Sequence, residues 1–134
     1  MKIQHFFDDP TSTLTYVVYD EGAKTGVVID TVTDFDPASG RTGNGSSDKV
    51  AGFIDELGLK IPYVLDTHAH ADHFTGLPYF KERYGCKTVI GRYITGVQAV
   101  FRDIFHLGAD FPVDGSQFDV LLQDEETLEA GPIR

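Results

Sequence analysis

Thr67-His68-Ala69-His70-Ala71-Asp72-His73 lies one residue beyond the apolar segment 61–65 and concentrates three histidines and a carboxylate in six positions. Imidazole nitrogens and carboxylate oxygens are the ligands that zinc and non-haem iron prefer. Packing explains the pattern poorly, because each polar ring at the end of a buried strand needs hydrogen-bond partners. A polar loop that is rich in histidine by chance is the alternative. We interpret the stretch as a metal site.

The spacing of these residues depends on the local backbone. On a helix, His68 and Asp72 share a face. On extended backbone, His68, His70 and Asp72 project together and His73 turns to the other side, and the strand-like residues upstream favour this arrangement. Downstream, Thr75 is suited to be a helix N-cap. The motif is therefore expected on a strand-to-helix loop at the mouth of a sheet, where α/β proteins place their chemistry.

The rest of the chain predicts alternating strands and helices, and hence an α/β fold. Ser47 is expected to cap the first helix, and the residues 34–48 before it, rich in Gly, Ser and Pro, are expected to form a surface loop. Five apolar residues share one side of the last helix: Val97, Val100, Phe101, Ile104 and Phe105. The predicted strands cover 13–19, 25–30, 61–67, 88–91, 118–122 and 127–133, and the predicted helices cover 48–57, 77–84 and 94–105.

His68-x-His70-x-Asp72-His73 resembles the signature of the metallo-β-lactamase superfamily, whose fold is an αββα sandwich with the metal at one edge. The segments 13–19, 26–31 and 67–76 are similar to the persulfide dioxygenase and glyoxalase II branch. The tail from 97 to 119 is similar to bacterial β-lactamase-like proteins of the persulfide dioxygenase group. The resemblance spans nearly the whole chain, and its signature is specific to the superfamily but not to a reaction.

The resemblance implies a set of site residues. The expected ligands of a divalent metal, Fe²⁺ or Zn²⁺, are His68, His70, Asp72 and His73, with Asp72 also the candidate catalytic residue. An Asp at the place of Asp30 supports the metal loop through hydrogen bonds in the superfamily, although a strand-end turn is the alternative. Asp66 and Thr67 flank the ligands and are expected to give similar support, or simply to end the strand.

The superfamily pattern continues with a further His, a bridging Asp and often a last His. His106 is the one histidine beyond His73, it lacks the Pro-Gly that precedes the family's ligand, and we expect it at a helix end. The expectation is therefore a C-terminally truncated chain. Residues 1–134 would form the N-terminal part of a metallo-β-lactamase-like domain, the N-terminal half of the sandwich only.

Three functions follow from this interpretation. The first is a mononuclear iron persulfide dioxygenase acting on a glutathione persulfide-type thiol, with His68 in a facial triad of ligands. The second is a binuclear zinc thioester hydrolase of the glyoxalase II type, with His68 and His70 on one zinc and Asp72 and His73 on the other. The third is an inactive half-domain, whose uncovered sheet face would pair with a second copy of the chain or with the missing C-terminal half.

Composition narrows the partners. The net charge of −10 disfavours a nucleic-acid partner, because a phosphate backbone would be repelled. No apolar stretch has the length of a signal peptide core or a membrane span, so no membrane partner and a cytoplasmic location are expected. The lone Cys86 excludes an internal disulfide and is expected to be packed rather than reactive. The resemblance to the superfamily implies a small-molecule thiol, thioester or persulfide substrate as the partner.

Overall fold

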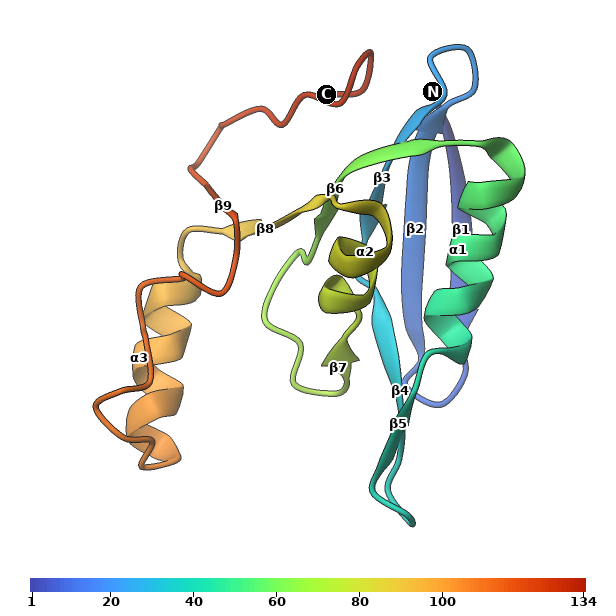
Figure 1. Ribbon diagram of the computed structural model, residues 1–134. Coiled ribbons are helices and arrows are strands. Elements are labelled where there is room, and N and C mark those ends of the chain that lie inside the picture. Colours follow the sequence, from blue (N-terminus) through green and yellow to red (C-terminus); the bar gives the residue numbers. More distant parts are fainter.

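The computed structural model describes residues 1–134 and has two sheets and three helices (Figure 1). In the larger sheet the first three strands are antiparallel, and β3, β6, β8 and β9 run parallel to one another. Its six strands lie in the order β1 (Lys2–Asp8), β2 (Thr13–Asp20), β3 (Thr25–Ile29), β6 (Lys60–Leu65), β8 (Lys87–Gly91) and β9 (Val120–Leu122). The smaller sheet contains β5 (Arg41–Gly43), β4 (Val32–Asp36) and β7 (Phe74–Thr75). The predicted α/β class is confirmed.

One face of the larger sheet forms the main core with helices α1 (Gly45–Leu57) and α2 (Leu77–Tyr84). Apolar residues recur at helical spacing in α1, and alternate residues of the strands face it. Ile54 of α1, Phe80 of α2 and Val64 of β6 are completely buried. Each side chain of this kind stabilises the fold by about 1.5–3 kcal/mol relative to an exposed position.

The opposite face of the larger sheet is also apolar but is largely uncovered. Ile3 pairs with Val18 across β1 and β2, and Val18 pairs with Val27 across β2 and β3, so all three project to this side. The only cover is the segment around Ala130 and Ile133, which packs on Val27. Ile3 remains 63% exposed. The larger sheet therefore has one apolar face that is only partly covered, as was expected of half a sandwich.

The structure corrects several predicted element boundaries. The predicted surface loop contains the hairpin of β4 and β5, and β1 is a strand that the sequence did not predict. The predicted strand 127–133 is only a tight turn with a bridge between Ala130 and Ile133. Ser47 is not the cap of α1: it lies inside the helix, and its hydroxyl donates to the carbonyl of Val32 at 2.8 Å.

Helix α3 (Ile94–Ile104) lies apart from α1 and α2 in Figure 1. It has the predicted apolar side, but Ile94 is its one buried residue. Val100 and Ile104 are 56% and 59% exposed. No helix of the chain combines the length and the apolar character that crossing a membrane requires.

Candidate metal centre

The histidine-rich loop connects β6 to β7 and is held at both ends by backbone hydrogen bonds. Before the loop, the N–H of Asp30 donates to the carbonyl of Leu65 at 2.9 Å. After it, the N–H of Gly76 donates to the carbonyl of Thr31 at 3.0 Å. A Cβ on Gly76 would lie 2.9 Å from Ser47 Oγ, so only glycine allows this close approach to α1.

Asp30 lies at the centre of the hydrogen bonds that shape the loop. Its carboxylate accepts from the Thr67 N–H at 2.7 Å and from the Thr67 hydroxyl at 2.8 Å. It also lies 3.1 Å from His70 Nε2. Its φ of +53° is a left-handed conformation that Asp and Asn adopt more readily than most residues. Asp30 and Thr67 are thus hydrogen-bonded to each other beside the histidines.

The three histidines of the loop gather in one cluster. The ring centroid of His70 lies 4.3 Å from that of His68 and 4.4 Å from that of His73. The expectation that His73 turns to the other side is wrong. Residues 66–73 form bends rather than a continued strand, and these bends return His73 toward His70. His70, Asp72 and His73 each offer a ligand atom within 4.8 Å of the others.

His73 combines a buried ring with one nitrogen that has no partner. Its side chain is 1% exposed, yet its Nε2 atom has no hydrogen-bond partner. Its Nδ1 atom lies 3.3 Å from Thr13 Oγ1 and 3.4 Å from Asp72 Oδ1. A buried polar atom without a partner costs about 1–3 kcal/mol, and a cation bound to Nε2 would remove this cost. The donor set of imidazoles and a carboxylate therefore fits a divalent metal.

Two carboxylates lie behind His70. Asp66 is buried, and this burial, reinforced by the nearby Asp30 charge and opposed by a hydrogen bond from Thr75, raises its pKa to about 7. Its Oδ1 lies 3.9 Å from His70 Nε2, and Asp30 is closer to the same atom. Because Nε2 of His70 faces these carboxylates, Nδ1 is the atom left for a metal.

His68 is placed differently from the other two histidines. It is exposed, and its Nδ1 lies 2.9 Å from the Thr67 hydroxyl. Ligand atoms converge in two groups, one of His70, Asp72 and His73 and one of Asp30, Asp66 and His70. His68 belongs to neither group, although its ring is beside that of His70. A metal bound through His68 therefore requires Nε2 of that ring, because Nδ1 faces Thr67.

The loop opens into the larger of the two main hollows, with a volume of about 1110 Å³. His70, Asp72 and His73 line one wall. The β4–β5 hairpin, the β1–β2 turn and the start of α1 form the rest, and the sequence indicated none of them as part of a site. Phe35 and Phe74 meet edge to face at the rim, with ring centroids 5.3 Å apart.

Five carboxylates and the two cations of Arg41 and Lys49 line this groove. Asp34 accepts from the N–H of Ser46 at the start of α1, and Asp36 accepts from backbone and hydroxyl groups of its own turn. The cations of Arg41 and Lys49 also line the groove, and neither forms an ion pair within the chain. These cations are available to a negatively charged ligand.

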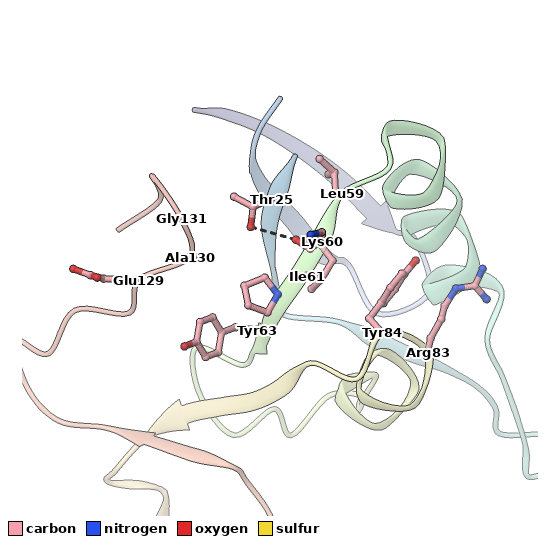
Figure 2. Close-up of a pocket in the computed structure, with 11 residues that line it drawn as sticks. Thr25, Leu59, Lys60, Ile61, Tyr63, Arg83, Tyr84, Glu129, Ala130 and Gly131 are labelled. Carbon is pink, nitrogen blue, oxygen red and sulfur yellow. Dashed lines mark hydrogen bonds between the residues drawn. The ribbon is translucent and has the colours of Figure 1, made fainter. Parts of the chain in front are cut away.

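The smaller hollow, of about 680 Å³, lies at the opposite end of β6 (Figure 2). Lys60, Tyr63 and Tyr84 line it from one side and the segment 129–131 from the other. Thr25 donates to the Lys60 carbonyl at its edge, at 3.3 Å. No residue of the histidine loop reaches it.

Two residues outside the loop lie as the sequence suggested. Cys86 is 4% exposed in the main core, and burial raises the pKa of its thiol to about 11, so its prediction as a packed residue is confirmed. His106 is exposed just after α3, with a φ of +52°, and belongs to neither convergent group.

Relatives of known sequence include a "probable metallo-hydrolase" of Burkholderia pseudomallei, 44% identical over 99% of this chain and 45% of that protein. Glyoxylase B2 of Dictyostelium discoideum is 37% identical over 99% of this chain and 46% of its own length. The mitochondrial persulfide dioxygenase ETHE1 of Homo sapiens is 34% identical over 72% of this chain and 34% of that protein. The chain thus spans less than half the length of these relatives.

Solved structures agree in fold. ETHE1 from Myxococcus xanthus superposes with a TM-score of 0.55 and 32% identity, covering 66% of this chain and 35% of that one. The BLEG-1 B3 metallo-β-lactamase has a TM-score of 0.64 over 97% of this chain and 57% of its own, at 19% identity, which supports the fold alone. The model of the metallo-beta-lactamase superfamily matches residues 8–132. The chain therefore belongs to the metallo-β-lactamase superfamily.

Proposed function

We propose that this chain provides the metal-binding loop of a metal-dependent enzyme that acts on a small-molecule thiol, thioester or persulfide. The observation that carries the proposal is the buried Nε2 atom of His73, which lacks a partner and lies beside His70 and Asp72. The relatives that are named as enzymes include a glyoxylase and persulfide dioxygenases.

The favoured activity is that of a persulfide dioxygenase with a ferrous ion. When bound, the ion supplies the redox chemistry with oxygen that side chains cannot provide. The chain's own residues would position it: His68 as the first ligand of the triad, with His70 close by, and Asp30 by holding Nε2 of His70. The unpaired Arg41 and Lys49 would bind a carboxylate of the substrate, with its sulfur toward the histidines.

A binuclear zinc thioesterase is the second candidate. The adjacency of Asp72 and His73 favours it, because both offer a ligand atom within 4.8 Å of one offered by His70 and could serve a second cation there. Two zinc ions supply an activated hydroxide near neutral pH. In this reading Asp72 is both ligand and candidate catalytic residue, while Asp66 and Thr67 keep the loop in place.

The loop cannot fill the coordination of either metal alone. A facial triad or a binuclear pair needs ligands beyond those in 68–73. We propose that they come from a partner, either a second copy of the chain or the remaining part of a longer protein. Since the chain spans less than half of its relatives, the activity is proposed for that assembly.

The first test is the metal content of the chain purified without oxygen, measured by plasma mass spectrometry. About one iron per chain supports the dioxygenase, and about two zinc ions support the thioesterase. His68→Ala should lose the metal in either case and His73→Ala should lose the zinc of a thioesterase, whereas the matched control His106→Ala should keep the metal. Loss of metal in His106→Ala would contradict the proposed site, whereas no stoichiometric metal in the unmodified chain would mean that the missing ligands lie outside it and that the chain is an inactive half-domain.

A second measurement separates the two activities. The metal-loaded assembly is given glutathione persulfide while oxygen is followed with an electrode, and separately a glutathione thioester while free thiol is followed. Oxygen uptake alone identifies the dioxygenase, and thiol release alone identifies the thioesterase. Neither reaction, in an assembly with full metal content, would contradict both.

A further inference from the structure

A line of polar side chains leads from the β1–β2 turn to His73. Asp8 is the last residue of β1 and pairs in register with Thr13, the first residue of β2. Thr11, in the turn between them, has its hydroxyl 2.7 Å from Asp8 Oδ2 and 3.0 Å from Thr13 Oγ1. Thr13 Oγ1 in turn lies 3.3 Å from His73 Nδ1. All four side chains are partly buried.

The direction of each hydrogen bond follows from the chemistry of its ends. A carboxylate only accepts, so the single hydroxyl proton of Thr11 goes to Asp8, which is the shorter and charge-assisted bond. The bond between the two hydroxyls is then donated by Thr13. With its own proton used in this way, Thr13 can only accept from His73, whose Nδ1 must therefore carry a hydrogen.

The reverse order of protons conflicts with three observations. It would place the hydrogen of His73 on Nε2, which is buried and has no acceptor. It would turn a lone pair on Nδ1 toward Asp72 Oδ1, which is 3.4 Å away and can only accept. It would also deprive Asp8 of its closest contact with Thr11, leaving the longer bond from the Thr11 N–H at 3.2 Å.

We propose that Asp8, Thr11 and Thr13 form a relay of hydrogen bonds that fixes the tautomer of His73, with hydrogen on Nδ1 and the lone pair of Nε2 presented to a metal. The three are positioning residues, because they act through His73 and touch no metal. The inference rests on the proposed metal site. Asp72 also contacts Nδ1, but it is 58% exposed and would turn away on binding a cation, whereas Thr13 would remain.

Asp8, the residue of the relay farthest from His73, is bonded to helix α1. Ser46, in the first turn of α1, donates its hydroxyl to Asp8 Oδ1 at 2.6 Å. Hydrogen bonds from Ser46 and Thr11 lower the pKa of Asp8 although its partial burial acts in the opposite direction, so its carboxylate remains an acceptor. The relay thus links α1 and the first hairpin to the orientation of one ring.

The direct test reads the tautomer of the metal-free chain. Long-range proton–nitrogen NMR of ¹⁵N-histidine-labelled protein distinguishes the two ring nitrogens of neutral His73, and His73→Gln assigns its signals. We expect hydrogen on Nδ1 in the unmodified chain. Thr13→Val, which keeps the shape of the side chain, should mix the two tautomers, and Thr13→Ser should restore the original one. Hydrogen on Nε2 in the unmodified chain would overturn the proposal.

Metal affinity gives the second readout, with Zn²⁺ alone as the probe. Thr13→Val and Thr11→Val should weaken binding about 10–100-fold, as is typical when a partner of a metal-bound histidine is lost. Thr13→Ser and the control Thr95→Val, which removes a hydroxyl from α3, should bind as the unmodified chain does. Circular dichroism checks that each variant is folded.

The two proposals fail in different ways. If the unmodified chain shows the expected tautomer but binds no zinc, the relay stands and the metal site is wrong. If it binds zinc but Thr13→Val and Thr11→Val change neither tautomer nor affinity, the metal site stands and the relay is wrong. Thr11→Val leaves the contact between Thr13 and His73 in place, so its effect tests the relay rather than that single contact.

Discussion

Helices α1 and α3 both place apolar residues at helical spacing, but only α1 has a partner for them. Val50, Ala51 and Ile54 of α1 are at most 2% exposed against the larger sheet. Val100 and Ile104 of α3 are more than half exposed, and the stacked rings of Phe101 and Phe105 lie open to solvent. The spacing identifies the apolar side of a helix, whereas the neighbouring elements determine whether that side is buried.

The metal loop is attached to the buried helix rather than to the exposed one. Ser47 of α1 bonds to Val32 and lies against Gly76, at the end of the loop. Ser46 holds Asp8, and the loop begins at β6, whose Val64 belongs to the same core cluster as Ile54 of α1. The candidate ligands are therefore positioned by the well-packed part of the molecule, and changes in α3 should reach them weakly.

The largest difference in stability is expected between alanine variants of two isoleucines, one in α1 and one in α3. Ile54→Ala should lower the free energy of unfolding by about 2–5 kcal/mol, because it leaves a cavity in the main core. Ile104→Ala removes the same atoms from an exposed site and should change it by less than about 0.5 kcal/mol. Urea unfolding of both variants measures the difference. Equal losses would mean that α3 is covered in solution, for example by a second copy of the chain.

A smaller effect is expected from Asp30→Asn. Asn tolerates the left-handed backbone, so the change mainly removes charge from the bonds to Thr67 and His70. The expected loss of stability is about 1–3 kcal/mol, together with faster amide hydrogen exchange at Thr67. Asp36→Asn, in the exposed β4–β5 turn, is the control. Unchanged exchange at Thr67 would show that Asp30 does not hold the loop.

The smallest effect is expected at Asp119, which precedes β9 and is bonded to α2 and β8. Asp119 accepts from Lys81 at 2.7 Å and from the Thr88 N–H at 2.9 Å, and the Lys81 hydrogen bond contributes most to lowering its pKa to about 2. Because the folded pKa is depressed, this stabilisation is present above the unfolded value of about 4 and lost as the pH falls toward the folded value. Asp119→Asn should cost less than about 1 kcal/mol at pH 7, since the pair is partly exposed and solvent screens it.

The measurement for Asp119 is the difference in unfolding free energy between the variant and the unmodified chain as a function of pH. That difference should shrink as the pH falls from about 4 toward the folded pKa of about 2. A difference that is constant over the same range would assign the effect to packing rather than to charge. Asp103→Asn, on exposed α3, should show no difference at any pH.

The sequence predicted the parts of the fold that depend on local signals. Helix 77–84 has its predicted bounds, although its N-cap is Gly76 and not Thr75, and the strands before and after the histidine loop are present. The superfamily was also apparent from the loop itself. These signals lie in residues that are close together in the sequence, so they can be recognised without knowledge of the tertiary structure.

The features that the sequence missed depend on residues far apart in the chain. The start of α1 is satisfied by Asp34 from β4 instead of by Ser47, and no local pattern reveals a cap that comes from another strand. His73 faces His70 because the loop bends, contrary to the extended backbone that was expected. Thr13 contacts His73 although the two residues are 60 positions apart in the sequence, and no spacing rule detects such a contact.

The backbone bonds of Asp30 and Thr31 have a consequence for the rate of metal capture. Two adjacent residues hold both ends of the histidine loop, through Leu65 before it and Gly76 after it. The entropy of closing this loop is therefore lost when the chain folds, not when a cation arrives. Capture and release of the ion should then proceed at the speed of ligand exchange, without waiting for a loop to fold around it.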